Sequence, residues 1–247
     1  ILTDRPTEVD LGKCDHILYG YLNGNEKNTA ASWLNDAVDE IKKCFLSKTL
    51  PILVGGTGMY LNALKNGLAD IPDINAATKN ETQKLFENHG LSFLYDEIKK
   101  NYSSTKIQEN DRQRIFRSYS LLKQTGKVLE QWQFNTSPEI DDLDYQILLT
   151  TTNRDELYPK AELRVDRMFE DVVIDEVNEL LGKGYDNNLP IMKAIGVREI
   201  SRLLNKEIDL EECKNIIKKN TRNYIKRQIT WIKGNNITQN IDKKKYM

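Results

Sequence analysis

The stretch that decides the fold is PILVGGTGMY, residues 51–60, an apolar run that passes into glycines and a threonine before a helical pattern begins. The apolar residues at 51–54 do not alternate with polar ones, which is typical of a strand covered on both faces in a parallel α/β sheet. Gly55 and Gly56 let the backbone approach a ligand closely. Because ligands bind at the carboxyl ends of such strands, Thr57 stands where chemistry is expected. The alternative is a strand-to-helix turn with Thr57 as N-cap.

Composition places the chain among globular proteins with one sizeable core, or with a core domain and a smaller insertion. Of its 247 residues, 39% are hydrophobic and 30% charged. No apolar run approaches the roughly 20 residues that cross a bilayer, so no membrane partner is expected. Three scattered cysteines and two histidines argue against disulfides and against a metal site. A reducing, cytoplasmic location is therefore expected.

The order of periodic segments predicts an α/β core interrupted by an all-helical insertion. A helix at 32–45, the apolar run at 51–54 and the helix from Gly58 form an α-β-α passage, whereas residues 75–133 show only helical periodicity. Strand composition returns at 145–150. The core is expected to comprise residues 1–73 and 139–247, and the helical insertion residues 74–138, with later helices at 155–181, 193–204 and 209–233.

A run of positive charge marks the last of these helices. No acidic residue occurs from Lys214 to Asn240, and Lys214, Lys218, Arg222 and Lys226 are spaced by four, so a helix places them on one face. Such a stripe is often only a solvated surface. The absence of acidic residues among these charges favours a polyanionic partner.

The segment NDRQRIFR, residues 110–117, carries a second cluster of positive charge. Asn110 or Asp111 can cap a helix here, which leaves Arg114 and Arg117 one turn apart with Gln113 beside them. Two guanidinium groups and an amide suit the recognition of phosphates and base edges. Surface ion pairs explain the same pattern equally well.

Two further segments allow a functional and a structural interpretation. Arg164 lies near the start of the long helix that follows the second strand, where it could bind a diphosphate, although composition alone favours an ion pair. Residues 189–199 combine a helix start with small residues. Close packing against RNA is one explanation, and helix packing through Ala194 and Gly196 is the other.

Taken together and in this order, these segments resemble the tRNA dimethylallyltransferases. The resemblance covers nearly the whole chain and rests on the joint order of six motifs. They are LVGGTGMY (53–60), NDRQRI (110–115), TGK (125–127), the helix at Arg164, LP…GVR (189–198) and TR…KRQITW (221–231).

The resemblance implies a P-loop-type parallel sheet with an all-helical insertion. It also implies transfer of a dimethylallyl group from its diphosphate to the exocyclic amine of the adenine 3′ of the tRNA anticodon. That base would be flipped out of its stack, because a stacked adenine hides its amine. Thr57 would contact the nucleotide at the reaction centre. Arg164 would bind the diphosphate, where negative charge develops as the bond breaks.

The same resemblance implies a set of contacts to the tRNA anticodon stem-loop, whose unpaired bases expose their edges. Arg222 and Arg227 would support the phosphate site or the RNA backbone. The implied tRNA-binding residues are Lys79, Gln113, Arg114, Ile115, Phe116, Arg117, Lys193 and Arg198.

Two family motifs do not occur in this sequence. It has no Gly-Lys-Ser/Thr phosphate loop and no Asp-Ser pair supplying the general base, so the expectation is the C-terminal four-fifths of a family member, without the first strand, acting as a monomer. Mg²⁺ is expected for the intact enzyme, with its ligands in the absent segment. Two alternatives stay open: a catalytically dead tRNA-binding remnant and a small-molecule P-loop kinase.

Overall fold

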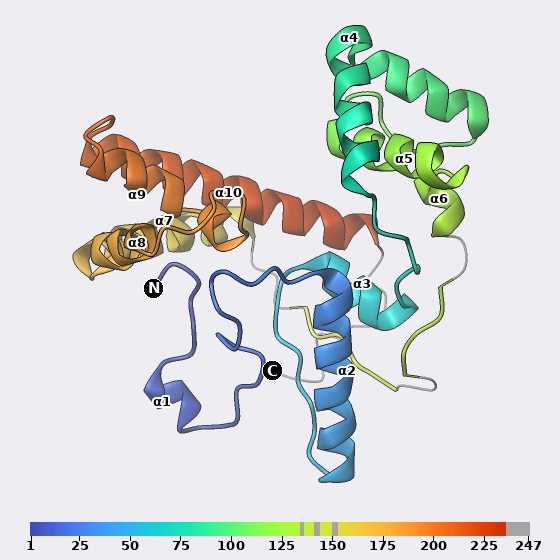
Figure 1. Cartoon of the computed structure of the whole chain (residues 1–247). Coiled ribbons are helices and arrows are strands. Elements are labelled where there is room, and N and C mark those ends of the chain that lie inside the picture. Colours follow the sequence, from blue (N-terminus) through green and yellow to red (C-terminus); the bar gives the residue numbers. More distant parts are fainter. Residues whose placement is uncertain (134–135, 141–143, 150–152, 236–247) are drawn as a thin grey trace. The chain divides into compact units, whose positions relative to one another are not determined.

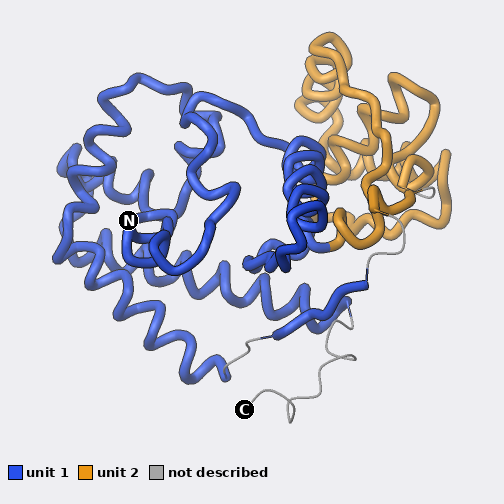
Figure 2. Tube along the Cα trace, turned by 90° about the horizontal axis from the view of Figure 1, so that it is seen from below, with its two compact units in different colours: residues 1–61, 142–247 blue, residues 62–141 orange. Residues whose placement is uncertain are grey.

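The structure is a computed structural model that describes residues 1–133, 136–140, 144–149 and 153–235. All regular secondary structure in these ranges is helical. The chain divides into two compact units, which Figure 2 shows in different colours. Unit 1 contains residues 1–61 and 142–247, and unit 2 contains residues 62–141. No helix in the described ranges is long and apolar enough to cross a membrane.

The core of unit 1 is built by the helices of the C-terminal half (Figure 1). These are α7 (Arg154–Glu170), α8 (Val173–Gly182), the 3-10 helix η1 (Ile191–Lys193), α9 (Val197–Leu204) and α10 (Leu210–Gly234). Each contributes one apolar stripe, as expected of amphipathic helices. The buried side chains include Val165, Met168, Val173, Val177, Val197, Ile200, Cys213 and Ile217.

Two helices expected to be continuous are each divided. The helix predicted at 155–181 breaks at Asp171, whose extended backbone (φ −92°, ψ −163°) ends α7. The break lets the valines of α7 and α8 enter the same cluster. The helix predicted at 193–204 starts only at Val197, because Gly196 before it adopts φ 106°, which glycine tolerates and other residues rarely do.

The N-terminal half of unit 1 contains α1 (Glu8–Leu11), α2 (Ala30–Leu46) and the start of α3 (Gly58–Asn66). Thr29 begins α2 through a capping box with Ser32. One face of α2 is buried through Leu34, Ala37, Val38 and Ile41.

Unit 2 is a helical unit with its own core. Its main helices are α4 (Ala76–Asn101), α5 (Arg112–Thr125) and α6 (Leu129–Trp132). Gly90 interrupts α4 with a φ of 82°, and α4 changes direction in Figure 1. Helix α5 ends at Gly126, which adopts the left-handed conformation (φ 73°) and donates its N–H to the Leu122 carbonyl, as is common at helix C-termini. The core contains Leu94, Tyr95, Ile98, Ile107, Ile115, Tyr119 and Val128.

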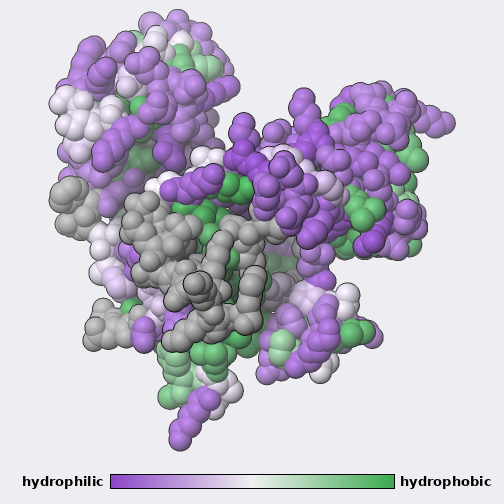
Figure 3. All heavy atoms as spheres, turned by 180° about the vertical axis from the view of Figure 1, so that it is seen from behind, coloured by the Kyte–Doolittle hydropathy of each residue, from purple (hydrophilic) through white to green (hydrophobic). Residues whose placement is uncertain are grey.

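The expectation of a buried strand at 51–54 is not met. Residues 51–57 have no regular secondary structure, and the exposed fractions are 76% for Ile52, 41% for Leu53 and 77% for Val54. Of the strand predicted at 145–150, residues 145–149 likewise have no regular secondary structure, Leu148 is 63% exposed, and Thr150 lies outside the described residues. A strand exists only where a neighbouring chain completes its hydrogen bonds, and no described segment pairs with either one. Hydrophobic side chains accordingly lie open on the face drawn in Figure 3.

Candidate functional site

The turn at residues 55–58 leads directly into α3. The carbonyl of Thr57 accepts hydrogen bonds from the backbone N–H groups of Tyr60 (3.0 Å) and Leu61 (3.4 Å), which start the helix. The Thr57 side chain is exposed, and its hydroxyl makes no hydrogen bond to any residue that the structure describes. A hydroxyl held at a helix start and open to solvent is available to a ligand.

Two glycines of this turn lie against α10. A Cβ added to Gly58 would come within 2.0 Å of Trp231 Cδ2, and one added to Gly56 within 2.1 Å of Gln228 Nε2. A Cβ on Gly55, by contrast, would meet nothing within 4 Å. Gly56 and Gly58 therefore allow a close approach between the turn and the helix, whereas Gly55 has no packing role in this structure.

The sequence predicts that these glycines let a ligand approach the backbone, whereas side chains of α10 lie against two of them. Gln228 and Trp231 belong to the motif at 221–231, to which no contact with the glycine turn was assigned. Their helical spacing of three places them on one side of α10, facing the turn. A tryptophan beside a polar stripe on the last helix is the signal that could have indicated this packing.

Aromatic side chains support the turn from α2. The ring of Tyr60 stacks on Trp33, with 4.4 Å between ring centroids and 13° between planes. Nearby on the same helix, the Asp36 carboxylate accepts a hydrogen bond from the Tyr21 hydroxyl at 2.8 Å. Burial and the Asp36 carboxylate together raise the pKa of Tyr21. Tyr21 therefore keeps its proton throughout the neutral range and acts here as a hydrogen-bond donor.

Arg164 projects from α7 toward the N-terminal segment. Its guanidinium donates to the Ile1 carbonyl at 3.2 Å and pairs with the Asp4 carboxylate at 3.5 Å. No contact among the described residues joins Arg164 to Thr57. What the two share is α10, because α7 packs on this helix and the glycine turn lies against it.

The positive charges of α10 fall into two groups. Lys218 pairs with Asp166 of α7 at 2.8 Å, Lys214 lies 3.9 Å from the same carboxylate, and Arg222 pairs with Glu162. Two acidic residues one turn apart on α7 therefore pair with three of the four positive charges that were predicted to face a polyanion. Lys226 and Arg227 remain exposed.

In unit 2, Asp111 begins α5 as predicted. Its carboxylate accepts a hydrogen bond from the Arg114 N–H at 3.1 Å and pairs with the Arg114 side chain at 3.3 Å. Gln113 and Arg117 are exposed on the same helix, and Lys79 is exposed on α4. None of these three makes an ion pair with a described residue.

Two residues assigned to tRNA belong instead to the packing of unit 2. Ile115 is fully buried in its core. Phe116 is half-buried and meets Phe86 edge-to-face at 5.0 Å, with the Arg112 guanidinium 5.2 Å from the Phe116 ring centre. The predicted contact of Ile115 with RNA is therefore corrected to a packing role, because its side chain is fully buried. Phe116 also packs through its ring, and its contact with RNA stays a prediction.

The segment around Gly196 packs closely, as the structural alternative had it. A Cβ on Gly196 would come within 2.5 Å of the Leu2 side chain. Glu199 accepts hydrogen bonds from the Gly196 N–H (3.0 Å) and from Asn220 of α10 (2.8 Å). Lys193 and Arg198 flank Gly196 and are exposed.

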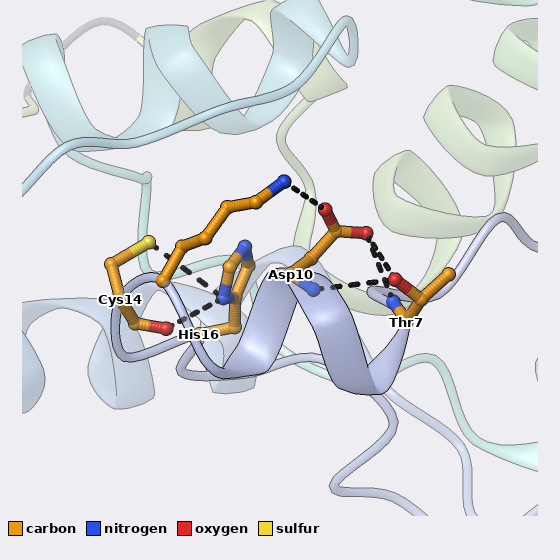
Figure 4. A network of polar contacts seen from close by, with 5 residues as sticks. Thr7, Asp10, Cys14 and His16 are labelled. Carbon is orange, nitrogen blue, oxygen red and sulfur yellow. Dashed lines mark hydrogen bonds and ion pairs between the residues drawn. The ribbon is translucent and has the colours of Figure 1, made fainter.

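No three His, Cys, Asp or Glu side chains converge into a possible metal site in the described ranges. Figure 4 shows a smaller polar network at α1. There the Asp10 carboxylate accepts hydrogen bonds from the hydroxyl (2.7 Å) and the backbone N–H (3.1 Å) of Thr7. These two hydrogen bonds lower the pKa of Asp10 to about 2. Cys14 Sγ lies 3.8 Å from His16 Nδ1. This network caps a short helix and offers only two soft ligands.

Comparison with known proteins gives one consistent result. A family model described as IPP transferase matches residues 1–235. A protein of Ehrlichia chaffeensis named tRNA dimethylallyltransferase is 35% identical over 234 residues, which cover 94% of this chain and 77% of that protein. One of Pelagibacter ubique with the same name is 34% identical, covering 94% and 74%.

Solved structures agree in fold. The full-length tRNA isopentenylpyrophosphate transferase of Bacillus halodurans superposes with a TM-score of 0.62 at 28% identity, covering 94% of this chain and 73% of that one. A eukaryotic dimethylallyltransferase captured acting on tRNA gives a TM-score of 0.74 at 23% identity, covering 94% and 59%.

Proposed function

Since the chain belongs to the IPP transferase family and has the fold of that family, we propose that it transfers a dimethylallyl group to tRNA. The donor is dimethylallyl diphosphate, and the acceptor is the exocyclic amine of the adenine 3′ of the anticodon. In the reaction a carbon–nitrogen bond forms, the carbon–oxygen bond to diphosphate breaks, and the amine loses a proton. The family match over residues 1–235 carries this proposal. No observation favours a binding remnant or a kinase.

Thr57 is the residue proposed to contact the reacting nucleotide. Its hydroxyl is free of described partners, and the glycine turn that carries it is fixed on Trp231 and stacked through Tyr60 on Trp33. A hydroxyl on a rigid turn holds a hydrogen bond to a ligand at little cost in entropy, because its position is already set.

Arg164 is proposed to bind the diphosphate. Its guanidinium is already turned toward two oxygen acceptors, the Ile1 carbonyl and the Asp4 carboxylate. Guanidinium groups bind carboxylate and phosphate oxygens with the same fork geometry. Diphosphate would therefore replace the Asp4 carboxylate, and the resulting contact would strengthen as negative charge builds on the leaving group.

Contacts to tRNA are proposed for residues 74–138 and, separately in unit 1, for Lys193 of η1 and Arg198 of α9. The supporting observation is the exposure of Lys79, Gln113 and Arg117, which carry no competing acidic partner in the described ranges. Arg114 joins them at a helix start, and Lys193 and Arg198 add two charges.

The proposal also covers the parallel sheet, the cellular location, the oligomeric state and the metal ion. Residues 51–54 and 145–149 are proposed as strands of a parallel sheet in the core formed by 1–73 and 139–247, since their apolar side chains would then be buried. The enzyme is proposed to be a cytoplasmic monomer. Mg²⁺ is proposed only as the ion that accompanies diphosphate. The described residues do not form a site for it, and no step here runs through it.

The experiment that tests the function uses this chain, dimethylallyl diphosphate and unmodified tRNA, followed by mass analysis of the digested nucleosides. The expected product is adenosine carrying one dimethylallyl group. Thr57→Val is expected to abolish most turnover and Thr57→Ser to retain it, because serine keeps the hydroxyl. Absence of product with the unaltered chain overturns the proposal.

A further inference from the structure

The outward face of α10 carries three lysines that form no ion pair with a described residue. Lys219, Lys226 and Lys233 are all exposed, and none makes an ion pair with a described residue. Because they are seven residues apart, they lie on the same side of the helix, opposite buried Ile217. Lys226 also follows the four-residue spacing of Lys214, Lys218 and Arg222, but those three residues pair with α7.

The rest of this face is polar. Asn223 and Thr230 lie between the lysines and are exposed. No Asp or Glu occurs in α10 from Lys214 onward. Acidic residues enter only at its first turn, where Asp209, Glu211 and Glu212 line a hollow together with Lys219. The positive potential is therefore strongest toward Lys226 and Lys233.

The spacing of the lysines identifies the shape of the partner. A helix rises about 1.5 Å per residue, so successive lysines are about 10 Å apart along the axis. They cannot converge on one phosphate or diphosphate, but they match an extended polyanion. A membrane surface fits less well, because helices that lie on lipid insert an apolar face and this face has none.

We propose that the lysine face of α10 (Lys219, Lys226 and Lys233) binds the phosphate backbone of the substrate RNA. This inference rests on the proposed function, which supplies the RNA. The contact gives affinity and position without sequence preference, because it reaches phosphates and not base edges. Its contribution comes from release of counterions and is therefore strongly dependent on salt.

The test compares two variants of the full chain that lose equal charge. The first is Lys219→Gln with Lys226→Gln and Lys233→Gln. The matched control is Lys27→Gln with Lys42→Gln and Lys183→Gln, which removes three other exposed lysines of unit 1 without described ion pairs. Affinity for unmodified tRNA is measured from low to high salt, and thermal melting checks that both variants are folded.

The lysine-face variant is expected to bind on the order of tenfold more weakly or worse at 0.1 M salt. The slope of log affinity against log salt should fall by about two to three, since each phosphate contact contributes nearly one. The control should match the unaltered chain. Among single variants, Lys219→Gln should have the smallest effect, because the acidic first turn already offsets its charge.

Equal slopes in all three proteins overturn the inference, as does an equal loss in the control or a lack of tRNA binding by the unaltered chain. Binding to anionic vesicles that only the lysine-face variant loses, with RNA binding unchanged, assigns the face to lipid and overturns it too. Prenyl transfer is assayed on the same samples. If the unaltered chain yields no prenylated product but the lysine-face variant still shows a reduced salt slope, the proposed function is refuted and the RNA-binding surface is supported.

Discussion

The indole ring of Trp231 lies directly against Gly58, so close that any side chain on Gly58 would overlap it, with Cβ only 2.0 Å from Cδ2. This contact joins the last helix to the turn that precedes α3. Gln228 makes the equivalent contact to Gly56 one helical turn earlier. Helix α10 therefore sets the position of Thr57, although the two are more than 150 residues apart in the sequence.

Replacing Gly58 with alanine is expected to lower the free energy of unfolding by about 1–3 kcal/mol, the usual cost of overpacking. Urea unfolding measures it. Gly56→Ala should cost less, because only the flexible end of Gln228 must move. Gly55→Ala is the matched control, since a Cβ there meets nothing within 4 Å. Equal effects at all three positions would contradict the packing described.

The same contact predicts coupling between Gly58 and Trp231. Trp231→Ala opens the space that a Cβ at position 58 needs, so the double variant should be more stable than the sum of the two single changes implies. Coupling between contacting residues is about 0.5–3 kcal/mol. If the two changes prove additive within error, the ring does not press on the turn.

Asp166→Asn is expected to weaken the attachment of α7 to α10. The carboxylate lies 2.8 Å from Lys218 and 3.9 Å from Lys214, and the Lys218 side chain is only 17% exposed. The expected loss is about 1 kcal/mol, at the upper end for pairs near a surface, and it should shrink at high salt. Glu170→Gln, an exposed residue of α7 without a described ion pair, is the control and should change little.

The buried thiol of Cys213 predicts a loss of stability in alkali. Burial raises its pKa from 9.0 to about 11. A thiol whose pKa is higher in the folded state favours folding below pH 9, and this contribution is lost as the pH rises through 11. Urea midpoints at pH 7.5 and pH 10.5 should therefore differ less in Cys213→Ala than in the unaltered chain. Cys14→Ala, which changes an exposed thiol, should leave the pH dependence as it was.

In unit 2, a buried hydrogen bond ties α4 to α5. The hydroxyls of Thr82 and Ser120 are 2.9 Å apart, and these side chains are 1% and 4% exposed. Thr82→Val should cost about 1–3 kcal/mol, because Ser120 is left buried without this partner. Adding Ser120→Ala should recover part of the loss. A double variant less stable than Thr82→Val alone would argue against this explanation.

Local signals in the sequence predicted local structure well. Asp111 caps α5 as expected, and α10 begins directly after its N-cap Asp209, at the start of the helix predicted at 209–233. Each depends on a few neighbouring residues, since a cap satisfies backbone groups within one turn. The joint order of motifs likewise indicated the family that the comparisons establish.

Long-range pairing could not be predicted in the same way. The spacing of Lys214, Lys218 and Arg222 showed correctly that they share a face, but not that Glu162 and Asp166 lie opposite. For Ile115 the motif indicated contact with RNA, whereas packing against α4 buries it completely. That Thr57 and Arg164 belong to one site stays a proposal. The turn that carries Thr57 and the helix that carries Arg164 both pack on α10, but no described contact joins the two residues.

The sequence by itself determined the start of α5 at Asp111, the start of α10 after Asp209, the glycine turn before α3 and the family, because these depend on neighbouring residues and on motif order. Only the tertiary structure decided which charges of α10 are neutralised and which stay free, and that Trp231 holds the glycine turn. It also left Ile52, Leu53 and Val54 exposed. The physical reason is the same in each case: burial and charge pairing depend on partners that are distant in the chain, and periodicity carries no information about them.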